Sequence, residues 1–254
     1  MKKFVALSVS SIVGTRYADV LTYPRVDLRL QAERVKELQQ LDVDDLLFCD
    51  ESCSSNFGLL GKGCVGVVVV GHWRRKRVAV KIRRVDADRA MMQREAKLLE
   101  RANGVGVGPR LYAVSNNFLV MQLIDGHPLP EWLVGMSNMA LVKRVLHDVM
   151  EQCWRLDQAG LDHGELSHAP KHIIVHKGIR PFIVDFETAS VDRKPANVTS
   201  VCQFLFVSDL VRRNFENAFG VNRQRIIAAL KRYKHLRTRE DFERVLSACR
   251  LQTT

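Results

Sequence analysis

The feature that most restricts the fold is a glycine-rich segment that is followed by strands rather than by a helix. Residues 61–66 read Gly-Lys-Gly-Cys-Val-Gly, and residues 65–70 are rich in β-branched side chains. Arg74-Arg75-Lys76 supplies a polar turn, and residues 77–82 alternate in polarity, which predicts a β-hairpin. A dinucleotide-binding loop would lead into a helix, so we expect the glycines to form a flap whose backbone amides approach phosphate.

Lys81 ends the run Val78-Ala-Val-Lys81, fifteen residues after Gly66. Apolar neighbours would bury its stem and hold its ammonium group in one place. This context favours a ligand of the α- and β-phosphates of a nucleotide over a solvated lysine. The next helix offers Glu95 and Glu100 as orienting carboxylates, and five residues rotate a helix by ~500°, so the two face different directions. We expect Glu95, in the middle of the helix, to pair with Lys81.

Apolar spacing predicts further strands and helices beyond the hairpin. The expected elements are a helix over 87–102 capped by Asp86, strands near 110–114 and 118–122, a helix over 138–158, strands at 173–175 and 183–185, and two or three final helices. A hinge at about 122–126 divides them. The predicted fold class is α+β, with a small, mostly antiparallel sheet carrying one helix, followed by an α-rich part.

The first 56 residues are predicted to form an extension. Two lysines and an apolar run begin it, a pattern also found in signal peptides, but serines interrupt the run and a first strand is favoured. A helix is expected over 27–41, with Asp27 as its cap and with Leu28, Val35 and Leu38 on one face. The expected domains are an extension over 1–56, a β-rich lobe over 57–124 and an α-rich lobe over 125–254.

Two stretches of the α-rich part carry carboxylates that suit chemistry. Glu165 stands in His163-Gly-Glu165-Leu166, and Asp185 follows the apolar run Phe182-Ile-Val. A carboxylate at the end of a buried strand suits Mg²⁺, and a loop carboxylate can accept a hydroxyl proton.

In this order the elements resemble the eukaryotic-like protein kinase fold, and they look most like the compact atypical kinases of archaea, similar to RIO kinases and the KEOPS-complex kinase. The resemblance covers roughly residues 57–215 and is carried by the glycine flap, Lys81, Glu95, Leu119–Gly126, His163-Gly-Glu165 and Asp185-Phe-Glu187. It implies a two-lobed kinase-like fold with an N-terminal extension and a serine/threonine phosphotransferase activity that uses ATP and Mg²⁺.

The resemblance also implies a role for each matching residue. The nucleotide would be bound by Gly61, Gly63, Gly66 and Lys81 at its phosphates and, at adenine, by the backbone of Gln122 and Ile124, with Met121 as gatekeeper. The catalytic set would be Glu165 as base, Lys81, and Glu95 to orient Lys81. The metal would be held by Asp185, with His172 as a second candidate.

Several positions depart from the family pattern. Glu165 replaces an aspartate and is one methylene longer, and the metal-binding asparagine corresponds to Pro170 or, with two extra loop residues, to His172. Mg²⁺ prefers oxygen to imidazole, and Lys171 could instead neutralise phosphate. Glu187 replaces a glycine, so we expect that segment to be more fixed than in regulated kinases. About a dozen residues separate it from the next predicted helix, too few for a long activation loop.

Composition adds a charge argument. The net charge is +11, which attracts polyanions such as RNA or the ribosome, although a basic surface alone has the same sign. The six cysteines are scattered, so neither a zinc site nor a disulfide scaffold is indicated. No apolar run reaches the ~20 residues of a membrane span, and we expect a cytoplasmic protein.

The sequence therefore predicts an ATP- and Mg²⁺-dependent phosphotransferase, either an atypical serine/threonine kinase with autophosphorylation or an ATPase. Two alternatives stay open. The first is a nucleotide-binding pseudokinase scaffold, motivated by the replacements at Glu165, Pro170 and Glu187. The second is an RNA- or ribosome-associated protein, motivated by basic stretches such as Arg74–Arg77, Arg212-Arg213 and Lys231-Arg232. A small-molecule kinase also remains open, because that group shares the fold.

Overall fold

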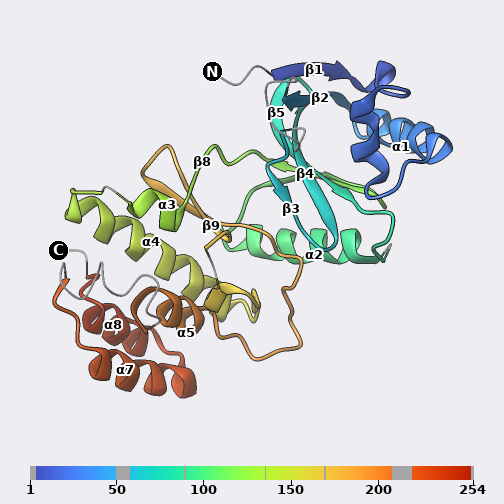
Figure 1. Ribbon diagram of the computed structural model, residues 1–254. Helices are drawn as coiled ribbons and strands as arrows, with labels where there is room; N and C mark the ends of the chain where they lie inside the picture. The colour runs from blue at the N-terminus through green and yellow to red at the C-terminus, as the bar shows by residue number, and fades with distance from the viewer. Residues whose placement is uncertain are drawn as a thin grey trace. The chain divides into compact units, whose positions relative to one another are not determined.

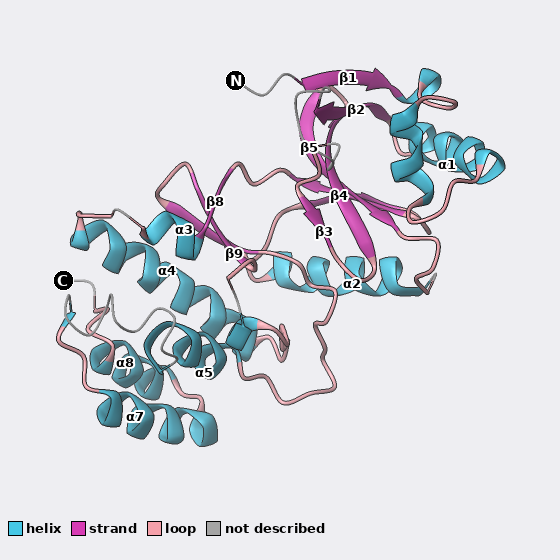
Figure 2. Ribbon diagram, in the orientation of Figure 1, coloured by secondary structure: helices cyan, strands magenta, loops and turns pink. Residues whose placement is uncertain are grey.

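The computed structural model describes residues 4–49, 58–88, 90–134, 136–168, 170–207 and 219–252. The chain divides into two compact units. Unit 1 comprises Met1–Glu100 and Pro109–Leu123, and unit 2 comprises Arg101–Gly108 and Ile124–Thr254. Unit 1 is built around an antiparallel sheet and unit 2 is mainly helical, which confirms the predicted α+β class (Figures 1 and 2).

The sheet of unit 1 holds seven strands among the described residues, ordered β1-β2-β4-β5-β7-β6 with β3 paired to β4. The strands are β1 (Phe4–Ser8), β2 (Val43–Cys49), β3 (Gly61–Lys62), β4 (Gly66–Trp73), β5 (Lys76–Arg83), β6 (Leu111–Val114) and β7 (Phe118–Gln122). The predicted hairpin is confirmed as β4 and β5. Arg74 and Arg75 join these strands with φ of 47° and 63°, as the centre of a two-residue type I′ turn requires.

Side chains alternate between the two faces of this sheet, and each face packs against a different helix. Val78, Val80 and Ile82 of β5 belong to a core that also contains Val35 and Leu38 of α1 (Leu28–Gln40). The residues between them, Lys81 among them, face the other way, toward α2 (Ala90–Gly104), whose residues through Glu100 lie in unit 1. Figure 1 shows the two helices on different sides of the strands.

The N-terminal segment is part of this unit and shares its core. Two short 3₁₀ helices, Val9–Ser11 and Arg16–Thr22, connect β1 to α1. The predicted helix is confirmed as α1, with the side chain of Asp27 accepting from Leu30 N at 3.0 Å. The predicted apolar face was wrong at Leu28, which is 61% exposed, because the first turn of α1 extends beyond the core. Strand β2 had not been predicted.

Arg34 fixes α1 to the sheet from inside the core. Its side chain is fully buried and donates to the backbone oxygens of Leu21 and Arg83 and to Asn117 Oδ1. Burial lowers its pKa to about 10, with Arg83 adding to the effect. Glu37 of the same helix accepts from Asn117 N at 2.9 Å. A buried charge that is hydrogen-bonded on several sides ties the extension to the β4–β7 strands.

Unit 2 combines helices with a sheet in the order β10-β9-β8. Its strands are β8 (Gly126–Pro128), β9 (Ile173–His176) and β10 (Arg180–Ile183). Its helices are α3 (Leu129–Leu133), α4 (Met139–Gln158), the 3₁₀ helix Leu166–His168, α5 (Asn197–Cys202), the π-helix Gln203–Val207, α7 (Arg223–Leu236) and α8 (Arg239–Ala248). Among the described residues, no helix is both long and apolar enough to span a bilayer.

Three predicted boundaries moved. The helix expected from residue 87 appears as α2 from Ala90, so Asp86 is not its cap and instead accepts from Arg84 at 2.9 Å. The strand expected at 183–185 is β10, Arg180–Ile183, because it pairs with β9 from residue 180 onward. Asp185 therefore lies two residues beyond the strand. Strand β8 replaces part of the expected hinge by pairing with β9.

Candidate functional site

The candidate functional residues of unit 1 include an ion pair. Lys81 Nζ lies 2.9 Å from Glu95 Oε1 and 2.8 Å from Oε2, and both side chains are 4% exposed. Glu100, the alternative partner, is exposed on α2. Lys81 is held in place by strand β5, and Glu95 by the middle of helix α2. Burying two charges costs hydration free energy, which only a close and well-oriented ion pair can offset. The pair holds the lysine ammonium at a defined point.

The glycine segment packs directly over Lys81. Gly61 is part of β3, which pairs with β4, and Gly63 N donates to Gly66 O at 2.8 Å, which closes the tip of the flap. A Cβ at Gly66 would lie 2.9 Å from Ile82 O and 3.1 Å from Lys81 Cγ. Only glycine fits at position 66, and the backbone therefore comes close to the lysine.

The chain leaving unit 1 is already partly hydrogen-bonded. Met121 of β7 pairs with Ala79, and Gln122 pairs with Val78. Gln122 N donates to Arg110 O at 2.8 Å, so this amide is not available to adenine in the present arrangement. Ile124, the third residue expected near adenine, begins the second unit and is half-buried.

The candidate functional residues of unit 2 lie on and near the loop around His163. His163 is fully buried, its N donates to Asn197 Oδ1 at 2.9 Å, and its Nε2 lies 3.0 Å from Val184 O. Its carbonyl accepts from Thr188 Oγ1 at 3.0 Å. Burial lowers the pKa of His163 to about 4, so the imidazole is neutral at pH 7 and donates to Val184 O. His163 anchors the loop rather than acting on protons.

Glu165, the predicted base, makes one contact to a side chain of the same loop. Its Oε2 lies 3.1 Å from His172 Nε2, and Glu165 is 41% exposed whereas His172 is 15% exposed. The pairing was not predicted, because seven residues separate the two positions. Pro170 and Lys171, the other candidates from the sequence, are exposed.

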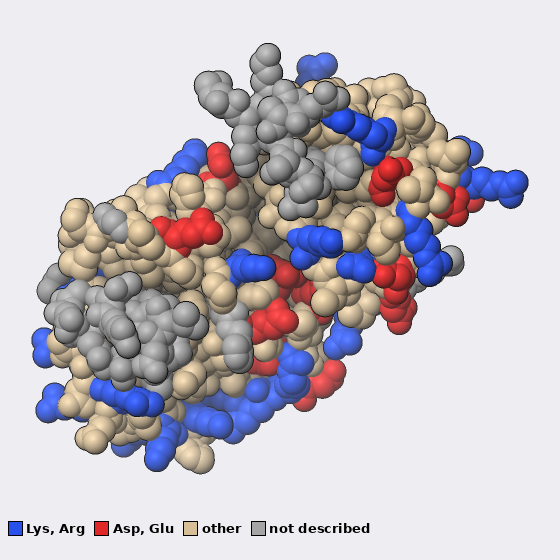
Figure 3. Space-filling model, in the orientation of Figure 1, with Lys and Arg blue, Asp and Glu red and all other residues tan. Residues whose placement is uncertain are grey.

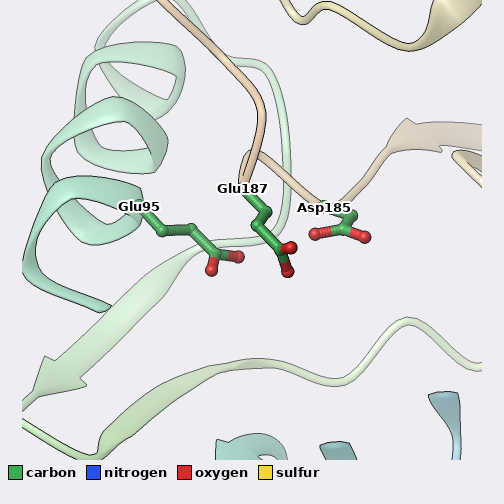
Figure 4. Close-up of side chains that lie close together, drawn as sticks. All are labelled: Glu95, Asp185 and Glu187. Atoms are coloured by element: carbon green, nitrogen blue, oxygen red, sulfur yellow. The ribbon is translucent and has the colours of Figure 1, made fainter. Parts of the chain in front are cut away.

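Asp185 and Glu187 follow β10. Asp185 has a φ of 68°, in the left-handed region that aspartate tolerates better than most residues. Glu187 does not have positive φ, so the strained position falls on the acid itself rather than on the site of the missing glycine. A carboxylate oxygen of Asp185 and one of Glu187 lie within 4.8 Å of each other. Figure 4 shows these two side chains of unit 2, and also Glu95 of unit 1 on its helix.

A buried polar network supports this loop. Asp157 accepts from Asn197 N and Nδ2, both at 2.8 Å, and from Tyr233 Oη at 2.9 Å. Burial raises the pKa of Asp157 despite these donors, and burial beside Asp157 raises the pKa of Tyr233. Because Asn197 also holds His163, the network links α4, α5 and α7 to the loop. Sequence reasoning missed Asn197, which has no motif of its own.

Residues 68–201 match the family model described as RIO domain. The match spans 201 − 68 + 1 = 134 of the 254 residues, which is more than half of the chain. The chain belongs to the RIO family. RIO proteins form an atypical kinase and ATPase family whose members bind ATP and Mg²⁺ in general. No curated protein matches the chain closely enough to count as a relative.

The RIO match begins within β4 and ends within α5, so it includes Lys81, Glu95, Glu165 and Asp185. The residues present fit the ligands that RIO proteins bind. The close approach of Gly66 to a buried lysine suits an anionic phosphate, and adjacent carboxylates on Asp185 and Glu187 supply the oxygen donors that Mg²⁺ prefers. Among the described residues, the possible metal-ligand atoms that group with Asp185 include a carboxylate oxygen of Glu187. They do not include a ring nitrogen of His172.

Proposed function

We propose that the chain is an ATP- and Mg²⁺-dependent phosphotransferase of the atypical serine/threonine kinase type, with autophosphorylation or ATPase activity. The observation that carries this proposal is the Lys81–Glu95 ion pair. Its two side chains are only 4% exposed and lie behind a glycine flap, so they are not solvated surface charges. RIO family membership supports it independently.

Each residue has a defined task in this proposal. Glu95 fixes Lys81, and Lys81 with the amides of the flap binds the phosphates. Asp185, helped by Glu187, provides oxygen ligands for the metal. Bound ATP and Mg²⁺ supply the phosphoryl group and neutralise its charge. Glu165 orients the acceptor hydroxyl and accepts its proton, a task that an exposed carboxylate on a loop can perform.

The test is phosphate release and phosphate transfer from labelled ATP with and without Mg²⁺. Wild type is expected to turn over ATP only with Mg²⁺, and Lys81→Ala and Asp185→Ala to lower the rate by at least ~100-fold, as loss of a positioned charge does. Asp185→Asn is the better-matched variant because asparagine tolerates the 68° φ of this position. Unchanged activity in both Lys81→Ala and Asp185→Asn would exclude the proposal.

The scaffold alternative predicts a different pair of results. A pseudokinase would be stabilised against heat by ATP, since any ligand of the native state raises its stability, yet it would release no phosphate. The proposal instead predicts thermal stabilisation and turnover together, and both lost in Lys81→Ala.

A second function is supported by the charge of α7. This helix contains Arg223, Arg225, Lys231, Arg232 and Lys234 and no acidic residue. Arg232 is bound to Asp241 at 2.6 Å, but no ion pair involves the other four among the described residues. Figure 3 shows Lys and Arg gathered along the edge where Figure 1 draws α7. We propose that the exposed basic surface of α7 binds RNA.

The other basic stretches are less suited to this task. Arg74 is bound by Asp42 at 2.7 Å, and Arg75 N donates to Asp44, so acidic side chains already neutralise part of the charge at this turn. Arg212-Arg213 lies outside the described residues. The charge on α7 is therefore the most available to phosphates.

The RNA proposal is tested by anisotropy with a labelled single-stranded RNA. Affinity should fall steeply as salt rises from roughly 50 to 200 mM, and Lys231→Ala with Arg225→Ala should flatten the logarithmic slope by about 1.4, since each phosphate contact contributes about 0.7. Arg74→Ala is the matched control and should leave the slope unchanged. Affinity that is independent of salt, or an equal effect of Arg74→Ala, would contradict the assignment.

A further inference from the structure

The His172–Glu165 contact joins a shielded imidazole to an exposed carboxylate. His172 Nε2 lies 3.1 Å from Glu165 Oε2, and their side chains are 15% and 41% exposed. The two atoms lie within ion-pair distance, and a charge-assisted hydrogen bond between such groups is stronger than one between neutral groups. The carboxylate thus has one oxygen fixed by the loop and a large part of its surface open.

His172 is itself held in place on two sides. Its carbonyl accepts from Val184 N at 2.9 Å, and the next residue begins β9. Its ring meets the ring of His163 at 5.5 Å with an interplanar angle of 67°. His163 is anchored in turn to Val184 O and Asn197. His172 lies in the turn that leads into β9, and these contacts fix the position of its backbone and ring.

The other ring nitrogen decides which tautomer fits. His172 Nδ1 is buried and has no hydrogen-bond partner among the described residues. A buried N–H without an acceptor costs about 1–3 kcal/mol, so the proton belongs on Nε2, the ring atom that lies 3.1 Å from Glu165 Oε2. The pair is then a donor imidazole and an acceptor carboxylate.

A glutamate in this loop needs such a donor. Glutamate has one more rotatable bond than aspartate, and ordering its side chain costs up to about 2 kcal/mol. We propose that His172 is a positioning residue for Glu165, holding Oε2 by the Nε2–H hydrogen bond so that the carboxylate is presented to the acceptor hydroxyl. This inference rests on the proposed phosphotransferase function, in which Glu165 is the base.

The inference competes with the assignment of His172 to the metal. Nε2 lies 3.1 Å from Glu165 Oε2, and the group of possible ligand atoms around Asp185 does not include His172 among the described residues. Imidazole is also a poor ligand for Mg²⁺, whereas carboxylate oxygens are good ones. The two roles make different predictions for the dependence of the rate on Mg²⁺.

The first experiment compares His172→Ala with His172→Gln. The alanine variant should lower kcat by ~10- to 100-fold, as misplacement of a reacting group does, with the KM for ATP changed by less than about twofold. Glutamine can donate from its amide nitrogen, so His172→Gln should recover most of the rate. The Mg²⁺ concentration for half-maximal rate should stay the same in both. A rise of tenfold or more in that concentration, with kcat restored at saturating Mg²⁺, would overturn the inference in favour of the metal role.

A double variant separates positioning from a structural role. If His172 acts through Glu165, then Glu165→Gln combined with His172→Ala should be no slower than Glu165→Gln alone. Multiplied losses would show that His172 acts independently and would overturn the inference. Thermal melting of each variant checks that the rates are those of folded protein.

A readout without turnover keeps the inference distinct from the proposed function. In wild-type protein, the ¹⁵N shifts of the His172 ring should report a proton on Nε2, and Glu165→Ala should change the Nε2 shift. This result would support the hydrogen bond even if the wild type transferred no phosphate, in which case only the phosphotransferase function would fail. A proton on Nδ1, or no response to Glu165→Ala, would overturn the inference whatever the activity.

Discussion

Lys81 in unit 1 and Glu165 in unit 2 are held in opposite ways. Lys81 lies on a central strand, is 4% exposed and meets a carboxylate on a packed helix. Glu165 lies on a loop, its side chain is 41% exposed, and among the described residues its one side-chain partner is another loop residue. The group that we propose to bind phosphate is thus fixed by regular elements, where sequence spacing is informative. The group that would act on the acceptor depends on local contacts that spacing does not reveal.

The largest effect on stability is expected from removing the partner of Lys81. Glu95→Ala removes a carboxylate that pairs with a buried ammonium, so the free energy of unfolding should fall, by up to about 3–5 kcal/mol. Chemical denaturation measures this change. Glu100→Ala, on the exposed face of the same helix, should change it by less than about 0.5 kcal/mol. Equal effects of the two substitutions would show that the pair contributes no more than surface charge.

A residue of unit 2, His163, should make the free energy of unfolding depend on pH. The pKa of His163 is about 4 in the folded protein and 6.5 in the unfolded chain, so the unfolded chain binds more protons between these values. The contribution is fully present above pH 6.5 and is lost as pH falls through 4, a total of about 3 kcal/mol. Plots of the free energy of unfolding against pH should differ in slope between wild type and His163→Phe from pH 4 to pH 6.5. Parallel curves would mean that His163 is not buried in its neutral form.

A smaller loss should follow removal of Arg34 from the core of unit 1. Arg34→Met removes the arginine donor from the backbone oxygens of Leu21 and Arg83, whereas Asn117 Oδ1 still accepts from Arg83, and the loss is partly offset by the burial cost that lowers the pKa of Arg34 to about 10. The net loss of unfolding free energy should be about 2 kcal/mol. Arg29→Met is a control on an exposed position of the same helix. A stabilised Arg34→Met protein would show that the arginine is there for another reason.

The smallest effect tests the backbone at Asp185. A residue with a φ of 68° is strained unless it is glycine, asparagine or aspartate, so Asp185→Ala should destabilise by about 1 kcal/mol and Asp185→Asn by close to zero. Thermal melting resolves the two. If the two variants have the same melting temperature while both lose activity, the backbone conformation at this position does not affect stability, and the activity depends on the carboxylate alone.

Sequence reasoning predicted the elements that have a period. The β4–β5 hairpin, α1 and α4 follow from alternation, helical spacing and caps such as Asp27. Strand β2 escaped because Asp44 and Asp45 interrupt its apolar pattern and a register shift between Val43 and Asp45 breaks its alternation. Strand β8 escaped because its three residues carry no pattern and are held by pairing with β9.

The contacts of the candidate functional residues differ in the same way in how far the sequence predicts them. The choice of Glu95 over Glu100 needed only helix geometry, because one position faces the sheet and the other faces solvent. The contact of His172 with Glu165 needed the path of the loop, which depends on the anchoring of His163 by Asn197 from a distant helix. Long-range hydrogen bonds of this kind leave no periodic trace in a sequence.

The most direct test of the account is to measure nucleotide binding and ATP turnover in the same protein, wild type and Glu165→Gln. Calorimetry with ATP and Mg²⁺ should give dissociation constants within about twofold, because Lys81 and Asp185 are intact in both. Phosphate release should fall by ~100-fold or more in Glu165→Gln, the range expected for loss of a general base. Equal turnover in the two proteins, or binding without turnover in the wild type, would contradict the assignment of catalysis to Glu165.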